Sequence, residues 1–268
     1  MQRMRATAGL LAAAVLGMGA APAPVVVPPP GQAQAQMLKL PYLMASRTTT
    51  YYHAIPSQAR NIELLAQRLN GTVVEPGQVF NYYAVVGPYT AANGYGEGRM
   101  FVGCNIVPSI GGGVCQGAST LYSAILRTGL PVVERHHHSL TVPYLPPGED
   151  ATVAGDYLNF RFRNNLRGPV LIGASAGNRH LTVAIWGPVQ PPPIEVRHKV
   201  LKTFPYTTTR RVNPALKPGE ERVIFPGQEG VTVESWLEIR EPQGVVRRPL
   251  GIDHYRPSPR VVEVGPSA

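Results

Sequence analysis

Two stretches of the chain repeat apolar residues at the spacing of an α-helix. Ser57 is a suitable N-cap for the first helix, and Gly71 ends it. The second pattern begins at Gln116 and ends at Gly129-Leu130-Pro131. The apolar positions are Ile62, Leu65, Ala66 and Leu69 in the first stretch and Ala118, Leu121, Tyr122 and Ile125 in the second. Because residues at these spacings share one face of a helix, two amphipathic helices are predicted.

Alternating patterns predict strands around these helices. Residues 158–163 and 181–185 place an apolar side chain at every second position, which is typical of half-buried strands. Glu75-Pro76-Gly77 favours a turn, and residues 79–86 are expected to be extended. Residues 87–113 carry many glycines and little periodicity, so a long loop region is expected there. The first domain is therefore predicted to be α+β, with two or three helices and an antiparallel sheet.

Prolines separate this first domain, expected at residues 37–187, from the rest of the chain. Pro188 and Pro191-Pro192-Pro193 predict a stiff linker over residues 188–195. Beyond the linker, helical patterns vanish and short β-rich runs alternate with glycines. A small all-β domain is therefore expected at residues 196–268. We expect it to fold separately and to act on localisation more than on chemistry.

The first 36 residues have the pattern of a secretory signal peptide and a leader. Arg3 and Arg5 precede the uncharged, apolar residues 6–21, and small residues follow at Ala33 and Ala35. Cleavage is expected near Ala21 or after Ala35. The apolar run is shorter than the roughly 20 residues that a membrane span needs, so membrane contact is expected only during export. Residues 22–36 are expected to be a disordered Pro/Ala/Gln leader.

Composition and charge narrow the class of protein further. Of 268 residues, 44% are hydrophobic, which excludes general disorder, and 28 glycines with 28 prolines exclude an all-helical bundle. Lysine and arginine exceed the acidic residues by 25 to 16, giving a net charge of +9. This charge is spread along the chain and is not interleaved with aromatic residues, so no nucleic-acid partner is expected.

The densest chemical signal is a glycine run that leads into the second helix. In Gly111-Gly112-Gly113-Val114-Cys115-Gln116, the glycines allow a substrate to approach the backbone closely. A cysteine at a helix N-terminus faces unpaired N–H groups, which stabilise a thiolate. Backbone groups at Gly113, Val114 and Gln116 are expected to hold an oxyanion during acyl transfer.

Bases follow in the run Glu134-Arg135-His136-His137-His138-Ser139. A cysteine and a histidine in one exported domain meet the requirements of a thiol acyltransferase or hydrolase. Two other interpretations stay open: a disulfide between Cys104 and Cys115, and histidines without a chemical role. A cysteine and two histidines without a second close pair are a weak zinc pattern, so no metal site is expected. Acyl transfer by a thiol needs no organic cofactor, and none is expected.

Several ordered blocks resemble the VanW domain, named after vancomycin-resistance protein W, over about residues 45–187. The blocks are Arg60-Asn61-Ile62, residues 70–80, Gly94-Tyr95, residues 111–116, Glu134-Arg135-His136, His138-Ser139, Tyr144, Gly148 and Asp150-Ala151-Thr152-Val153. The chain departs from the usual pattern at Phe80-Asn81-Tyr82-Tyr83 and Gln116-Gly117-Ala118, which changes the fine shape of the pocket.

The VanW resemblance implies a set of site residues, because some family members act as L,D-transpeptidases through the motif cysteine. Carried over, Cys115 is the nucleophile and His138 the base, while Arg135 binds a substrate carboxylate or orients the histidine. His136, Ser139 and Asp150 are expected to support the site.

The tail is similar to the G-five domain, a small extracellular β module named for its glycines. The matching residues are Gly219, Gly227, Gly230, Gly244, Tyr255 and Val261-Val262-Glu263-Val264-Gly265. This resemblance implies either binding of N-acetylglucosamine-containing polymers or a plain β spacer.

The sequence thus predicts an exported cell-envelope protein that lies in the periplasm, in the cell wall or outside the cell. The favoured function is a cysteine L,D-transpeptidase-type acyltransferase that forms a thioester, with peptidoglycan stem peptides and glycan as partners. The alternative is a non-catalytic wall-binding protein linked to glycopeptide resistance, with Cys104 and Cys115 joined.

Overall fold

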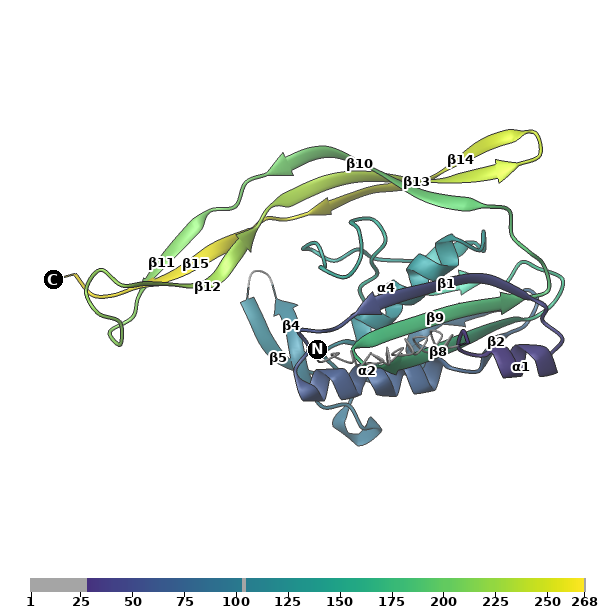
Figure 1. The fold of residues 1–268 in the computed structure, drawn as a ribbon, viewed down its shortest axis with the longest axis horizontal. Coiled ribbons are helices and arrows are strands. Elements are labelled where there is room, and N and C mark those ends of the chain that lie inside the picture. Colours follow the sequence, from purple (N-terminus) through teal and green to yellow (C-terminus); the bar gives the residue numbers. More distant parts are fainter. Residues whose placement is uncertain (1–27, 103–104, 268) are drawn as a thin grey trace, which may run out of the picture.

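A four-stranded antiparallel sheet lies at the centre of the first part of the chain (Figure 1). The computed structural model describes residues 28–102 and 105–267, so most of the predicted signal peptide lies outside the described residues. The sheet has the order β1-β9-β8-β2, formed by β1 (Tyr42–Thr50), β9 (His180–Gly187), β8 (Val170–Gly177) and β2 (Thr72–Val74). Along β9, Leu181, Val183 and Ile185 join the main core, as their alternation predicts.

Helices α2 (Pro56–Leu69) and α4 (Val114–Leu126) pack on one face of this sheet. Both predicted helices are therefore present. The predicted cap is wrong, because Ile55 is the N-cap of α2 and Pro56 takes the first helical position, where a missing N–H is tolerated. The Ser57 hydroxyl instead donates a hydrogen bond to the carbonyl oxygen of Glu97.

Two predictions between these helices are also wrong. The segment expected to be extended is strand only in β3 (Val79–Asn81) and then turns into helix α3 (Tyr82–Val86). The Asn81 side chain caps α3 by accepting a hydrogen bond from the N–H of Ala84 at 3.0 Å. The expected loop contains a 3₁₀ turn (Ala91–Asn93) and a hairpin of β4 (Glu97–Val102) and β5 (Asn105–Ile110). These two strands pair only with each other among the described residues, and their apolar alternation is weak.

A three-stranded sheet, β3-β7-β6, contributes Phe80 and Phe162 to the core. It adds β6 (Val132–Glu134) and β7 (Arg161–Arg163), so the strand predicted at 158–163 is shorter than expected. Phe160 and Phe162 are both fully buried in the core, which explains why the alternation begins before the strand does.

The predicted disordered leader is wrong for its last residues. Helix α1 (Gln32–Met37) packs Ala35 against Leu171, Ala184 and Trp186 on the second face of the central sheet. The Trp186 indole N–H donates a hydrogen bond to the carbonyl oxygen of Pro30 at 2.8 Å. An apolar patch on the outer face of β8 and β9 therefore orders this segment.

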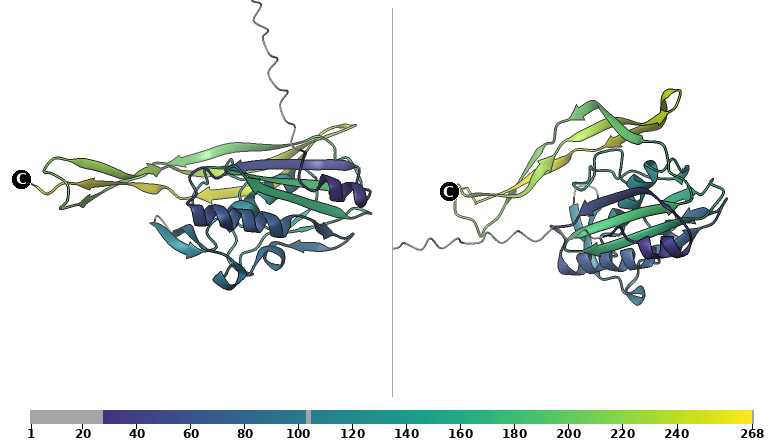
Figure 2. Two further views of the ribbon diagram at one scale, coloured as in Figure 1. Left: turned by 60° about the horizontal axis from the view of Figure 1, so that its bottom comes forward. Right: turned by 45° about the vertical axis from the view of Figure 1, so that its right-hand side comes forward.

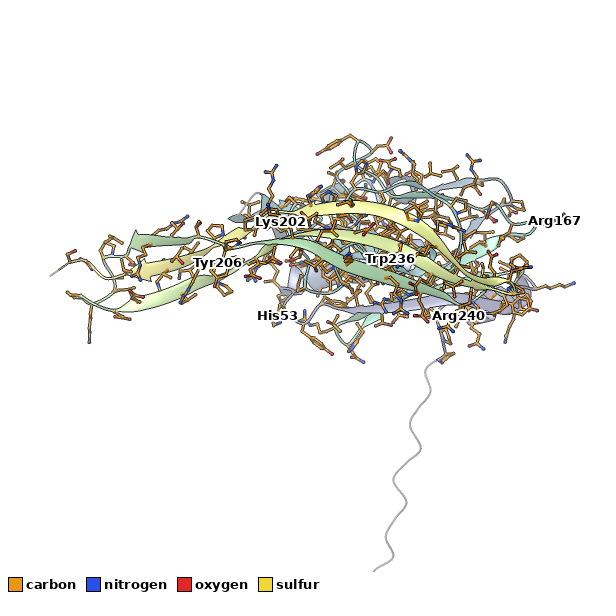
Figure 3. The ribbon with its side chains drawn as sticks, turned by 90° about the horizontal axis from the view of Figure 1, so that it is seen from above. His53, Arg167, Lys202, Tyr206, Trp236 and Arg240 are labelled. Carbon is orange, nitrogen blue, oxygen red and sulfur yellow. The ribbon has the colours of Figure 1, made fainter. Side chains whose placement is uncertain are left out.

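The rest of the chain is an all-β ribbon that lies over the first part and extends past it (Figures 1 and 2). Its two sheets have the orders β10-β13-β14 and β11-β15-β12. The strands are β10 (Ile194–Phe204), β11 (Thr208–Val212), β12 (Glu221–Gln228), β13 (Gly230–Glu241), β14 (Gly244–Tyr255) and β15 (Ser258–Val264). Seen from above, Trp236 lies over the first part and Tyr206 lies nearer the free end of the ribbon (Figure 3). The predicted α+β class with a following all-β module is confirmed.

Candidate active site

Cys115 is the second residue of α4, directly after a tight glycine turn. Gly113 is the N-cap with φ of 106°, a left-handed conformation that favours glycine. A Cβ atom at Gly112 would lie 2.6 Å from the Gly98 backbone, so the glycines also allow the β4–β5 hairpin to pack against the turn. Within the part of the chain that the structure describes, Cys115 is a free thiol of intermediate exposure. Cys104 lies outside that part, so their predicted pairing stays a prediction.

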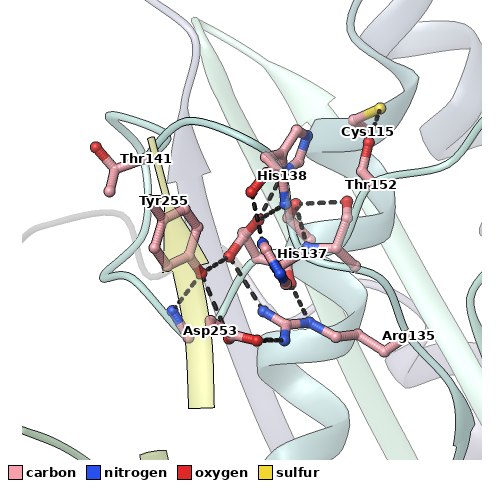
Figure 4. A network of polar contacts seen from close by, with 12 residues as sticks. Cys115, Arg135, His137, His138, Thr141, Thr152, Asp253 and Tyr255 are labelled. Atoms are coloured by element: carbon pink, nitrogen blue, oxygen red, sulfur yellow. Dashed lines mark hydrogen bonds and ion pairs between the residues drawn. The ribbon is translucent and has the colours of Figure 1, made fainter. Parts of the chain in front are cut away.

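The sulfur of Cys115 lies in a polar setting built by the segment after Asp150. The Val153 N–H and carbonyl oxygen are each 3.4 Å from Sγ, and the Thr152 hydroxyl is 3.7 Å away (Figure 4). Burial raises the pKa of the Cys115 thiol, but His138, the Val153 backbone and the Thr152 hydroxyl lower it, and the net pKa lies below the ordinary value. The site therefore favours the thiolate.

His138 is held by the buried carboxylate of Asp150. Its Nδ1 lies 2.6 Å from Asp150 Oδ2, which also accepts the His138 backbone N–H at 2.8 Å. This contact leaves Nε2 as the ring nitrogen that can exchange a proton with the thiol or a substrate. Burial lowers the pKa of His138, while Asp150 and Cys115 raise it above its ordinary value. Cys115, His138 and Asp150 thus form a cluster of a thiol, an imidazole and a carboxylate that orients the imidazole.

Asp150 is fully buried and receives donors from both parts of the chain. Arg135 Nη2 lies 3.2 Å from Oδ1, and the hydroxyl of Tyr255 in β14 donates to the same oxygen at 2.5 Å. Burial raises the pKa of Asp150, but His138, Arg135 and Tyr255 lower it to about 2. Arg135 also donates through Nη1 to both oxygens of Asp253 at 2.7 Å. The guanidinium of Arg135 therefore orients Asp150.

The predicted oxyanion donors differ in their availability. The N–H of Val114 donates to Gly111 at 3.1 Å, and that of Gln116 donates to Gly113 at 3.0 Å, so both groups are engaged in the turn. Among the described residues, no acceptor contacts the N–H groups of Gly113 and Cys115. The Gln116 side chain is buried and bonds to Thr49 and Thr50, away from the thiol.

Two predicted supporting residues lie beside the cluster without joining it. His136 Nε2 pairs with Glu134 at 3.0 Å. Ser139 is exposed, and its carbonyl oxygen accepts the Arg256 N–H at 2.7 Å. The sequence interpretation missed the roles of Thr152, Asp253 and Tyr255, although Thr152 and Tyr255 lie in the blocks that carry the two resemblances.

Two grooves border the cluster. The larger, of about 750 Å³, lies between the first part of the chain and β14, and Thr152, Arg135 and Asp253 are among its lining residues. The smaller, of about 580 Å³, is lined by His137, Ser139 and Tyr255 among others. Cys115 itself does not line either groove, but Thr152 connects the larger one to the sulfur.

Within the described residues, neither a metal site nor a membrane span is found. No three His, Cys, Asp or Glu side chains there are arranged to hold a metal ion. In the same part of the chain, every helix is too short or too polar to cross a membrane.

The fold and the site define a protein with two parts, an α+β domain that holds a Cys–His–Asp cluster and an all-β ribbon beside it. Two family models match these parts: that of the VanW like proteins matches residues 57–186, and that of the G5 domain matches residues 195–267. The chain therefore carries a VanW-like domain followed by a G5 domain, which confirms both resemblances found in the sequence.

Two curated proteins resemble about half of the chain or less. The chain is 37% identical over 138 residues to the uncharacterized protein YoaR of Bacillus subtilis (strain 168), covering 51% of this chain and 46% of YoaR. It is 28% identical over 112 residues to the vancomycin B-type resistance protein VanW of Enterococcus faecalis (strain ATCC 700802 / V583), covering 39% and 40%. The chain thus spans less than half the length of these two relatives. A solved G5 domain of an IgA1 protease is 26% identical, with a TM-score of 0.20, over 29% of this chain and 94% of that one.

Proposed function

We propose that this protein is an exported cell-envelope enzyme that acts on peptidoglycan as a cysteine-dependent acyltransferase of the L,D-transpeptidase type. The observation that carries the proposal is the Cys115 thiol at the start of α4 beside His138, whose Nδ1 pairs with Asp150 at 2.6 Å. A lowered thiol pKa beside a raised imidazole pKa favours the thiolate and imidazolium that nucleophilic attack on a carbonyl requires.

The reaction has two halves. The Cys115 thiolate attacks a stem-peptide carbonyl, and the N–H groups of Gly113 and Cys115 stabilise the oxyanion. The carbon–nitrogen bond then breaks, the leaving amine takes a proton from His138, and a thioester remains. In the second half, His138 takes a proton from the amine of a neighbouring stem peptide, this amine attacks the thioester, and the thiolate is released. If water attacks the thioester in place of the amine, the acyl group is released as a carboxylate and the protein acts as a carboxypeptidase.

The surroundings of the site support a peptide substrate. The groove of about 750 Å³ has room for a short peptide, and one of its lining residues is Thr152, whose hydroxyl is 3.7 Å from the sulfur. This chemistry requires no metal and no organic cofactor.

The envelope setting has separate support. Arg3, Arg5 and the apolar residues 6–21 predict export, and one relative is named for vancomycin resistance. The G5 domain supports a position at the wall, where its proposed partner is the glycan and that of the VanW-like domain is the stem peptide.

The proposal is tested by trapping the thioester. The purified protein is incubated with a disaccharide tetrapeptide from peptidoglycan, and its intact mass is measured after an acid quench. We expect an added acyl mass on the native protein and on the control Cys104→Ala, and none on Cys115→Ala. The contrary result is a native protein that forms no adduct and shows no cysteine that reacts with a thiol reagent. That result would contradict the proposal and support the non-catalytic wall-binding alternative, in which Cys104 and Cys115 are joined.

A further inference from the structure

The end of strand β14 reaches into the polar cluster of the VanW-like domain. The Tyr255 hydroxyl donates to Asp150 and accepts the Gly148 N–H at 2.8 Å. Two residues earlier, Asp253 accepts both hydrogen bonds from Arg135 Nη1. Side chains at i and i+2 of a strand point to the same face, so one face of β14 supplies both groups (Figure 4).

Asp253 and Tyr255 differ from the rest of β14 because they are buried. Within the described residues of β14, Asp253 and Tyr255 are the only buried positions, and Tyr255 is 2% exposed. The ring of His137 packs edge-on against the Tyr255 ring, with centroids 5.3 Å apart. A buried carboxylate without a partner is costly, and here Arg135 compensates it across the domain boundary.

Each oxygen of Asp150 has its own partners, and one of these partners comes from the G5 domain. Oδ2 faces His138, while Oδ1 is held by Arg135 and by Tyr255. With donors on both oxygens, the carboxylate cannot rotate without breaking a hydrogen bond. Its orientation, and with it the orientation of the His138 ring, therefore depends on a residue of the G5 domain.

We propose that Asp253 and Tyr255 of the G5 domain are positioning residues of the active site, which act through Arg135 and Asp150 to align His138 with Cys115. The inference rests on the proposed function of the cysteine, and it makes the G5 domain part of the catalytic unit. The tail was expected from the sequence to act mainly on localisation, and these contacts give it a second role.

The test uses the full chain with Tyr255→Phe, which removes one hydroxyl and keeps the ring. Asp253→Asn is the second variant, and Tyr206→Phe, on the free end of the ribbon, is the matched control. Thermal unfolding confirms that each variant is folded. Two properties are then measured: the pH dependence of Cys115 alkylation by iodoacetamide, and kcat and KM for acyl transfer to a soluble stem peptide.

We expect Tyr255→Phe to lower kcat about tenfold with little change in KM, because the loss of one hydrogen bond to a charged group misaligns the base. The alkylation midpoint should move to higher pH, since the thiolate loses its aligned imidazolium. Several titratable groups surround Cys115 and His138. Asp150, Arg135, Asp253 and Tyr255 belong to the polar network behind His138. The other groups are Tyr82, Tyr89 and Tyr144, and burial raises the pKa of each of these three tyrosines.

The outcomes separate this inference from the proposed function. If the native protein transfers acyl groups and both G5 variants match Tyr206→Phe in kcat and in alkylation, the positioning role is wrong. If the alkylation midpoint rises in these variants while the native protein forms no acyl adduct, the positioning role holds and the transpeptidase-type function fails. An alkylation midpoint that moves to lower pH also overturns the positioning role.

Discussion

Asp150 shows how one residue organises the site. Its carboxylate is removed from water, which raises its pKa, yet it accepts hydrogen bonds from His138, Arg135 and Tyr255. These partners outweigh burial and bring the pKa down from 3.8 to about 2. The ionised form is therefore stabilised in the folded protein, where it fixes the histidine beside the thiol.

This shift predicts a pH-dependent contribution of Asp150 to stability. A carboxyl group whose pKa is lower in the folded protein stabilises it above the unfolded pKa of about 4, and this stabilisation is lost as the pH falls through about 2. Asp150→Asn should therefore lower the free energy of unfolding at pH 7, and the gap to the native protein should shrink by about 2 kcal/mol near pH 2. Urea denaturation at both pH values measures the gap.

Asp156→Asn is the control for this experiment. The Asp156 side chain is 60% exposed and pairs with Arg161 at the surface, so its removal should cost less than about 1 kcal/mol. A gap for Asp150→Asn that stays constant between the two pH values would contradict the assignment of Asp150 as a buried, stabilised carboxylate.

Helix α4 connects the site to the core, because nearly all its residues are buried. Val114 and residues 116–126 are all buried, and Cys115 alone keeps intermediate exposure. Tyr82 in α3 donates a hydrogen bond from its hydroxyl to the Val114 carbonyl oxygen at 2.9 Å. Gly117 makes this contact feasible, since a Cβ atom there would overlap the Tyr82 hydroxyl and lie 2.5 Å from a methyl of Leu65.

Gly117→Ala should therefore destabilise the protein although alanine is the better helix former. Alanine gains up to about 1 kcal/mol in helix propensity, while overpacking a buried contact costs about 1–3 kcal/mol. Tyr82 is fully buried and cannot move aside, so we expect a net loss of stability and slower alkylation of Cys115. Gly177→Ala, where a Cβ atom meets nothing within 4 Å, should leave both unchanged. Equal unfolding midpoints for the two variants would contradict the close-contact argument.

The elements that the sequence predicted are those with a continuous buried face. Helices α2 and α4 repeat apolar residues because each packs one face on the central sheet, and Cys115 was assigned to a helix start for the same reason. Helix α3 was missed because its five residues are too few to show a helical period. The β4–β5 hairpin was missed because its sequence is rich in glycine and shows little apolar alternation, and the close contact of Gly98 with Gly112 is formed only in the fold.

The contacts between the domains lie beyond what a pattern can indicate. Asp253 and Tyr255 have the spacing of ordinary strand residues, and Arg135 is more than a hundred residues earlier in the chain. The sequence singled out Cys115 from the glycine run at a helix start and assigned roles to His138 and Arg135 through the family resemblance, but the arrangement of these side chains in space required the fold. The proline-rich segment suggested that the two domains fold independently. Two further contacts nevertheless join them: His198 of β10 lies 3.1 Å from Glu149, and Gln228 of β12 donates to the Thr141 carbonyl oxygen at 2.9 Å.

An apolar contact strengthens this polar interface. Leu237 and Ile239 of β13 are 2% and 4% exposed and belong to the same buried cluster as Leu126 and Leu130 of the first domain. A domain whose apolar residues complete the core of its neighbour loses this burial when the two separate. Unfolding of one domain should therefore destabilise the other.

We expect the native protein to unfold in a single calorimetric transition, and Leu237→Ala to lower its midpoint. Truncating a buried leucine costs about 2–5 kcal/mol, and here the loss falls on the shared core. Val245→Ala, at a position of β14 that is 62% exposed, is the control and should leave the midpoint nearly unchanged. Two separate transitions in the native protein, with Leu237→Ala shifting only one of them, would mean that the domains fold independently and that the interface does not couple the G5 domain to the site.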